Sequence, residues 1–128
     1  MLFRSEIASK GGGILNSVRK LRASSTTEAL KTRATAALGQ FAAHGTTTIE
    51  AKSGYGLDIA SELKILRLHK ELAAEQPLEI VSTFLGAHVV PPEFRGKPNG
   101  AEKYIALLID KLMPEAANQK LADRKSVV

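Results

Sequence analysis

Two glycine-containing segments of the chain each carry one side chain that can bind a small polar molecule. Tyr55 lies in the segment KSGYGL at residues 52–57, and His88 ends the segment FLGAH at residues 84–88. Both follow runs typical of β-strands, and in parallel α/β proteins ligands bind in the loops at the carboxyl ends of strands. A phenol there can donate a hydrogen bond, and an imidazole can polarise or orient a ligand group. We therefore expect Tyr55 and His88 to face one pocket.

Other candidate groups are few, because the chain has no cysteine and only three histidines. The lack of cysteine excludes disulfide frameworks, thiolate metal sites and cysteine nucleophiles. The histidines never form a His-x-His pair. We expect His44 to lie at a helix C-terminus, where a cation suits the helix dipole, and His69 to lie at the rim of a helix's apolar face. Glu50 and Lys52 share one face of a strand and are expected to form a buried ion pair.

Hydrophobic periodicity predicts that helices and strands alternate along the chain. Capping residues predict helices that begin near Thr26, Asp58 and Asn99, and β-branched or apolar runs predict strands. The expected elements are a helix over 6–23 interrupted by glycines, a helix from 26 to 44, a strand over 46–52, a helix from 58 to 76, a strand over 78–85 and a helix over 99–112. Alternation at this spacing favours right-handed βαβ units and a parallel sheet.

The length of 128 residues suits one domain with one modest core. Two parallel strands, however, leave both edges of a sheet unpaired, and parallel sheets normally carry helices on both faces. A (β/α)8 barrel takes about 250 residues, so two βα units with preceding helices correspond to about half of one. We therefore predict an α/β fold, and more specifically a partial (β/α)8 barrel of about two βα units.

The charge of the chain, +5 with a pI of 9.6, does not indicate nucleic-acid binding. Basic residues alternate with acidic ones along the predicted helices, and aromatic residues, at 5%, are too few to stack with bases. No segment approaches the roughly 18 apolar residues of a membrane span. We expect a cytoplasmic protein whose partner is a small molecule, and neither nucleic acid nor a membrane.

Several motifs together resemble one enzyme family. Beginning near Glu6 and ending near Asp123, the chain closely resembles the imidazolonepropionases, and the combination of KSGYGL and TFLGAH is the specific part of the signal. The motifs are GGGIL at 11–15, GTTTIEAKSGYGL at 45–57, ELK at 62–64, TFLGAH at 83–88 and PPE at 91–93. The resemblance implies a metal-dependent amidohydrolase of histidine degradation, which hydrolyses 4-imidazolone-5-propanoate to N-formimidoyl-L-glutamate.

The resemblance also implies the roles of particular residues. Tyr55 and His88 match the family's substrate-binding tyrosine and histidine, and the implied fold is a metal-bearing (β/α)8 barrel beside a small β-domain. The family holds its zinc or iron with a His-x-His pair, a further histidine and an aspartate, and none of these can be placed in this chain. The family's substrate-binding arginine and general base cannot be placed either. We therefore expect the chain alone to be inactive, with a homodimer left open for the whole protein.

The two ends of the chain are expected to be foreign to the rest. Residues 2–5 and 123–128 match what a widely used sequencing adapter encodes. We therefore predict that residues 6–122 are the barrel fragment and that residues 1–5 and 123–128 derive from the adapter.

Two alternatives stay open on the sequence alone. One is another amidohydrolase that acts on a cyclic amide or amidine. The other is a non-catalytic βαβ interaction module, which would unfold cooperatively as a soluble monomer over residues 6–122. A fragment with open sheet edges should instead aggregate or melt without cooperativity.

Overall fold

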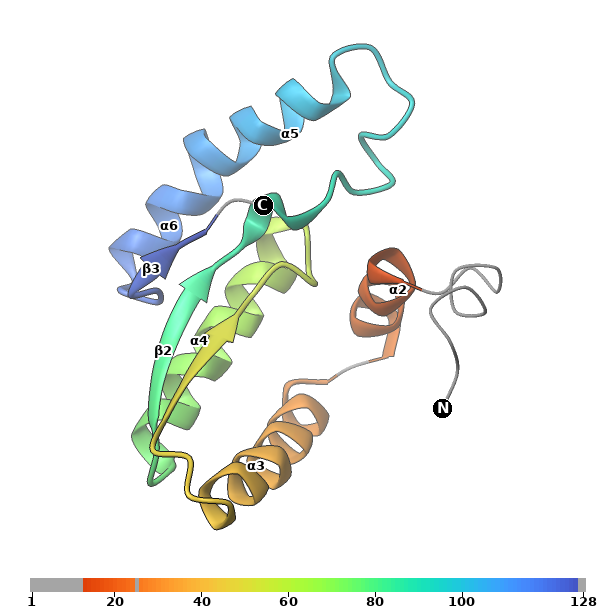
Figure 1. Ribbon diagram of the computed structural model, residues 1–128. Helices are drawn as coiled ribbons and strands as arrows, with labels where there is room; N and C mark the ends of the chain where they lie inside the picture. The colour runs from red at the N-terminus through yellow and green to blue at the C-terminus, as the bar shows by residue number, and fades with distance from the viewer. Residues whose placement is uncertain (1–12, 25, 127–128) are drawn as a thin grey trace.

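The computed structural model describes residues 13–24 and 26–126, and the predicted adapter residues 1–5 and the first part of the interrupted helix lie outside them. Helices and strands alternate along most of the described chain (Figure 1). The elements are α2 (Ile14–Ser24), α3 (Thr27–Ala43), β1 (Thr48–Lys52), α4 (Ile59–Glu75), β2 (Glu79–Phe84), the 3-10 turn η1 (Gly86–His88), α5 (Gly100–Leu107), the π-turn η2 (Leu108–Leu112), α6 (Met113–Asn118) and β3 (Arg124–Lys125). This order confirms the predicted α/β class.

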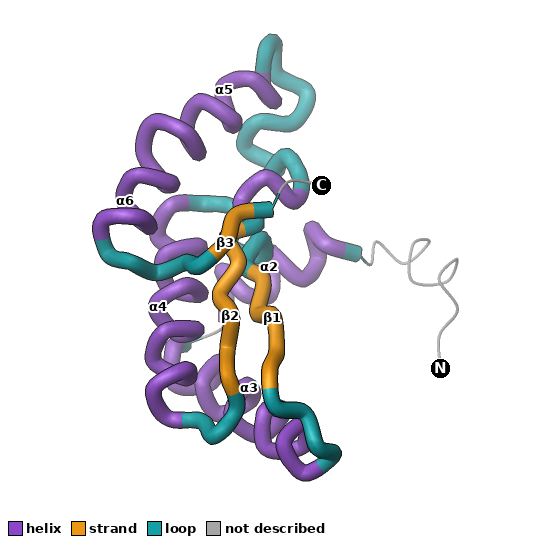
Figure 2. The backbone as a smooth tube through the Cα atoms, turned by 60° about the vertical axis from the view of Figure 1, so that its left-hand side comes forward, coloured by secondary structure: helices purple, strands orange, loops and turns teal. Residues whose placement is uncertain are grey.

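The described strands form a parallel sheet in the order β1-β2-β3 (Figure 2). β1 pairs with β2 from Thr48 opposite Glu79 to Lys52 opposite Thr83, which confirms the predicted parallel pair. The expectation of only two strands is wrong, because Arg124–Lys125 adds a short third strand to the far edge of β2. Main-chain groups of residues 123 and 126 also bond to β2. That residues 123–128 derive from an adapter stays a prediction.

Helix α4 connects the two longer strands and covers one face of the sheet (Figures 1 and 2). It begins at Asp58, whose side chain accepts a hydrogen bond of 2.8 Å from the amide of Ser61, as an N-cap residue does. It ends before Pro77, which cannot continue a helix. Its buried face includes Leu63, Leu66 and Leu72, so α4 contributes to both apolar clusters of the core.

The opposite face of the sheet is open among the described residues. Lys52 Nζ lies 3.5 Å from Glu50 Oε2, but the two side chains are 47% and 42% exposed. The predicted ion pair is therefore present, whereas its predicted burial is wrong, because no described element covers that face. Thr83 Oγ1 also donates to Glu50 Oε1 at 2.7 Å. This hydrogen bond, with the charge of Lys52, lowers the pKa of Glu50.

The helix after the second loop is longer than its periodicity indicates. It continues past the predicted end at Leu112 to Asn118, and a wider π-turn joins α5 to α6. In that turn the amide of Met113 donates to the carbonyl of Leu108. Pro114 follows at once and has no amide hydrogen for the carbonyl four residues earlier, so the α pattern is interrupted there in any case. No helix within residues 13–24 and 26–126 has the length and apolar character to cross a membrane.

Candidate functional site

The carboxyl ends of β1 and β2 bring the two predicted binding residues into contact. The ring centroids of Tyr55 and His88 lie 5.3 Å apart with an interplanar angle of 82°, which is an edge-to-face contact. Tyr55 is 38% exposed, so part of its surface is open to a ligand or to solvent. The structure thus brings together the two side chains that the sequence selected, whereas their role in substrate binding stays a prediction.

Three polar contacts join the loops that carry these rings. The amide of Ser53 donates to the Thr83 carbonyl at 3.0 Å, and the amide of Leu85 donates to Ser53 Oγ at 3.0 Å. His88 Nδ1 lies 3.2 Å from the carbonyl of Gly54. Because a carbonyl only accepts, Nδ1–H is the donor in this contact, and Nε2 remains for a second polar contact.

Gly54 permits this close approach of the two loops. Its φ of +97° lies in the region that L-residues rarely adopt. A Cβ atom there would lie 2.5 Å from the Leu85 carbonyl oxygen and 3.0 Å from the Cβ of His88. The glycine before Tyr55 is therefore needed both for its backbone conformation and for the packing of the second loop.

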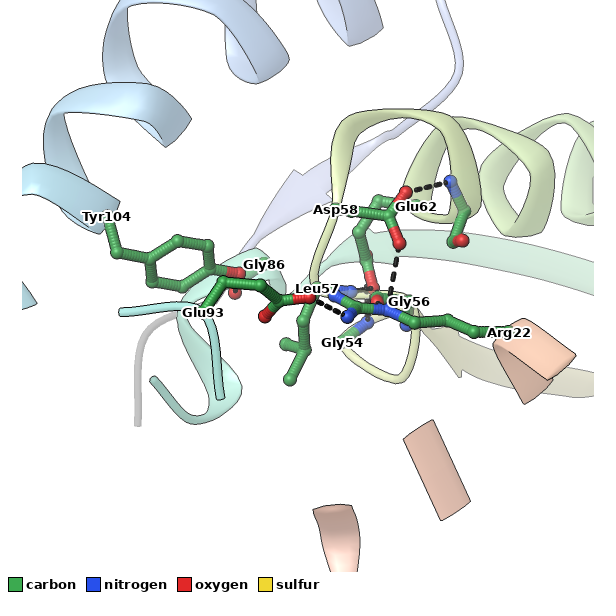
Figure 3. Close-up of polar contacts among 10 residues, drawn as sticks. Arg22, Gly54, Gly56, Leu57, Asp58, Glu62, Gly86, Glu93 and Tyr104 are labelled. Carbon is green, nitrogen blue, oxygen red and sulfur yellow. Dashed lines mark hydrogen bonds and ion pairs between the residues drawn. The ribbon is translucent and has the colours of Figure 1, made fainter. Parts of the chain in front are cut away.

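A buried acid, Glu62, bonds to the main chain of the loop that carries Tyr55, at Gly54, Gly56 and Leu57 (Figure 3). Glu62, in the first turn of α4, is 0% exposed. Its Oε1 accepts hydrogen bonds from the amides of Gly54, Gly56 and Leu57 at 3.0, 2.6 and 2.9 Å, and Oε2 accepts from Gly54 at 2.9 Å. Sequence reasoning assigned no role to Glu62. The available signal was its position on the helix face that also carries Leu63 and Leu66, where an acid needs a partner.

Arg22 of α2 contacts both loops from a distant part of the sequence (Figure 3). Its Nε donates to the Gly56 carbonyl at 2.6 Å and lies 2.8 Å from Asp58 Oδ2. Its Nη1 pairs with Glu93, which follows the second loop. Its Nη2 is buried without a hydrogen-bond partner among the described residues. No local pattern identified Arg22, because its partners lie far along the chain.

Tyr104 of α5 supports the second loop. Its hydroxyl donates to the Gly86 carbonyl at 2.7 Å, and the residue is fully buried, as expected for a core position. Burial and the negative charge of Glu62 raise the pKa of Tyr104, so the phenol keeps its proton and remains a donor.

The other two histidines lie away from this site. His44 is the C-cap residue of α3 as predicted, and its Nδ1 lies 2.7 Å from the Gln40 carbonyl. His69 is partly buried and its Nδ1 lies 3.0 Å from Ser82 Oγ. Burial lowers the pKa of His69 to about 4. Within the described part of the chain, no group of three or more His, Asp or Glu side chains could hold a metal. The described residues therefore do not fit a zinc or iron centre.

Tyr55 also borders a hollow between α2 and α3. Its lining carries two cationic side chains and no acidic one, and His88 is not part of it. The lining residues are Ser17, Lys20, Leu21, Leu30, Arg33, Ala34 and Tyr55. The side of Tyr55 that faces α2 and α3 therefore has a positive surrounding, which suits an anionic group.

Comparison with known proteins matches the chain to one segment of longer enzymes. No model of a protein family matches it. It is 49% identical over 112 residues to the imidazolonepropionase of Symbiobacterium thermophilum, covering 88% of this chain and 25% of that protein. It is 45% identical over 118 residues to the imidazolonepropionase of Treponema denticola, covering 92% and 28%, and 45% identical over 122 residues to that of Geobacillus kaustophilus, covering 95% and 28%. The sequence resemblance is thereby confirmed, and this chain is a homologue of one segment of the imidazolonepropionases, spanning between 25% and 28% of the length of these relatives.

Proposed function

We propose that this chain is the substrate-binding segment of an imidazolonepropionase, and that the whole protein hydrolyses 4-imidazolone-5-propanoate to N-formimidoyl-L-glutamate. The observation that carries the proposal is the contact of Tyr55 with His88 at the carboxyl ends of neighbouring parallel strands. This is where ligands bind in parallel α/β proteins. The parallel sheet and the covering helix are compatible with one part of a (β/α)8 barrel, and we assign the segment to such a barrel.

The two residues would bind and orient the substrate. The exposed phenol of Tyr55 can donate to a substrate oxygen or accept from a ring N–H. The imidazole of His88, whose Nδ1–H is directed to the Gly54 carbonyl, offers Nε2 as a second polar contact. The basic hollow beside Tyr55 suits a propanoate carboxylate.

Hydrolysis itself is assigned to other parts of the whole protein. In the family a zinc or iron ion supplies an activated water molecule, and the described residues do not fit such an ion. Each described histidine already has a main-chain or hydroxyl partner. We therefore derive no step of bond cleavage from this chain and confine its role to substrate binding.

A segment exchange tests this proposal. The aligned segment of the Geobacillus kaustophilus enzyme is replaced by the corresponding residues of this chain, and formation of N-formimidoyl-L-glutamate is measured. We expect an active chimera in which Tyr55→Phe and His88→Gln each raise KM about tenfold, the effect of losing one substrate hydrogen bond of about 1.4 kcal/mol.

His44→Gln is the matched control for His88→Gln. His44 lies at the C-cap of α3, before β1 begins, and so at the opposite end of that strand from Tyr55. We expect its KM to equal that of the chimera. A chimera that folds by circular dichroism but makes no product, or an unchanged KM in both site variants, would contradict the proposal.

A further inference from the structure

We propose that Glu62 is a positioning residue for substrate binding, which fixes the direction of the Tyr55 side chain by holding the main chain on both sides of it. This inference rests on the proposed function and adds a residue to its site. Glu62 lies beneath the loop and not among the residues that line the hollow beside Tyr55, so it acts through Tyr55.

The main chain around Tyr55 is bonded at nearly every polar group that precedes or follows the residue. Glu62 accepts from the amides of Gly54, Gly56 and Leu57. The carbonyl of Gly54 faces His88 Nδ1, and the carbonyl of Gly56 accepts from Arg22. Tyr55 therefore occupies the apex of a loop whose two arms are both fixed.

The side chain of Tyr55 reaches the surface of the molecule. It is 38% exposed, and its recorded ring contact is the edge-to-face contact with His88. An exposed side chain takes its position mainly from its main chain, so a loop that moves would carry the phenol away from its ligand. A displacement of about 1 Å is enough to weaken a polar contact strongly.

The conformation of the Tyr55 loop requires a hydrogen-bond acceptor at the position of the Glu62 carboxylate. Leu57 has a φ of 58°, a left-handed conformation that is uncommon for a residue of this kind. The amide hydrogens of Gly54, Gly56 and Leu57 converge on one point, and buried amides that lose their acceptor are costly. A carboxylate, which can accept several hydrogen bonds at once, meets this demand, and its position at the start of α4 is favoured by the helix dipole.

Gly56 packs closely against the first turn of α4. A Cβ atom on Gly56 would lie 2.6 Å from the amide nitrogen of Glu62 and 2.6 Å from the carbonyl carbon of Ser61. The loop thus rests directly on the first turn of α4.

The first test follows the ring contact in the full 128-residue chain. Tyr55 and Tyr104 are its two tyrosines, so labelled tyrosine rings give two sets of NMR signals. We expect the nuclear Overhauser contact between the Tyr55 ring and the His88 ring to disappear in Glu62→Gln, because the NH2 group of Gln replaces one carboxylate oxygen and places a donor against the Gly54 amide where an acceptor had been. The matched control is Glu102→Gln, an exposed acid in the first turn of α5, which should keep the contact.

The second test measures substrate binding in the active chimera. We expect Glu62→Gln to raise KM about tenfold with a smaller change in kcat, and Glu102→Gln to change neither. If Glu62 acts through Tyr55, Tyr55→Phe should add little to Glu62→Gln, so the double variant should stay near tenfold instead of about a hundredfold. A purely structural role would lower the amount of active enzyme and leave the KM of Glu62→Gln unchanged.

The outcomes separate this inference from the proposed function. A ring contact that survives Glu62→Gln, or single and double variants whose KM effects multiply, would overturn the positioning role. An inactive chimera contradicts the proposed function and leaves the ring contact to decide the role of Glu62. If Glu62→Gln is insoluble, Arg22→Gln takes its place, because it releases the Gly56 carbonyl on the other side of the loop. Its KM, alone and combined with Tyr55→Phe, is then expected to follow the same pattern.

Discussion

His69 should make the fold sensitive to acid. It lies on α4, and its Nδ1 is 3.0 Å from Ser82 Oγ on β2. The hollow that it borders is lined otherwise by alanine, leucine and isoleucine, so no charged side chain there can stabilise an imidazolium. Burial lowers the pKa of His69 from 6.5 to about 4, and the folded chain therefore holds the imidazole neutral.

The sign and size of the effect follow from linkage. As the pH falls, His69 takes up a proton in the unfolded chain before it does so in the folded chain. The contribution of the neutral His69 to the free energy of unfolding is therefore complete above about pH 6.5 and is lost as the pH falls towards about 4. The difference between the two pKa values corresponds to about 3 kcal/mol. By about pH 5, about 2 kcal/mol of this should already be lost.

The assay is an NMR titration of the chain with labelled histidine rings. The signal of His69 is identified by its loss in His69→Asn, whose side-chain amide can bond to Ser82 without titrating. We expect a midpoint near 4 in buffer and near 6.5 in concentrated urea. A midpoint near 6.5 in buffer, while far-ultraviolet circular dichroism still reports a folded chain, would refute the reasoning. His69→Asn should also reduce the loss of helical signal on acidification.

Two further predictions concern the loops. Gly54→Ala should raise the rate of amide hydrogen exchange across residues 53–57 and lower the free energy of unfolding by several kcal/mol, because its Cβ would lie 2.5 Å from the Leu85 carbonyl oxygen and a φ of +97° is strained for alanine. Gly39→Ala is the control. It lies within α3 with nothing within 4 Å of its Cβ, and it should raise the free energy of unfolding by about 0.5–1 kcal/mol. Ser53→Ala removes the acceptor of the buried Leu85 amide, which costs about 1–3 kcal/mol. Hydrogen exchange at the Leu85 amide should therefore become faster by the corresponding factor, and an unchanged exchange rate would contradict the contact.

The strands and helices of the central region were predictable because their signals are local. The run Thr46–Lys52 is β-branched, Asp58 is a good N-cap, and Pro77 ends the helix that Asp58 begins. The general rule on strand ends then placed Tyr55 beside His88 without any knowledge of side-chain contacts. Local pattern and a rule of topology were together sufficient for these features.

Features that depend on distant parts of the chain were not predictable in this way. Arg124–Lys125 lacks any strand pattern and forms β3 because the edge of β2 offers unpaired main-chain groups. Arg22 and Gly56 are 34 positions apart, so no periodicity relates them. The burial of the Glu50–Lys52 pair was inferred from a closed barrel, and in the described chain that face of the sheet is open.

The buried groups of this site hold its loops, and its exposed group is accessible to a ligand. Glu62 and Ser53 are fully buried and satisfy main-chain amides, while Tyr55 is open to solvent. The recorded polar contacts that hold the Tyr55 loop begin and end between Arg22 and Glu93, and none of them involves a metal ligand. The groups that hold the Tyr55 loop are therefore encoded within this segment. Exchanging the segment between imidazolonepropionases should then change KM for the substrate and leave the chemistry of bond cleavage with the rest of the enzyme.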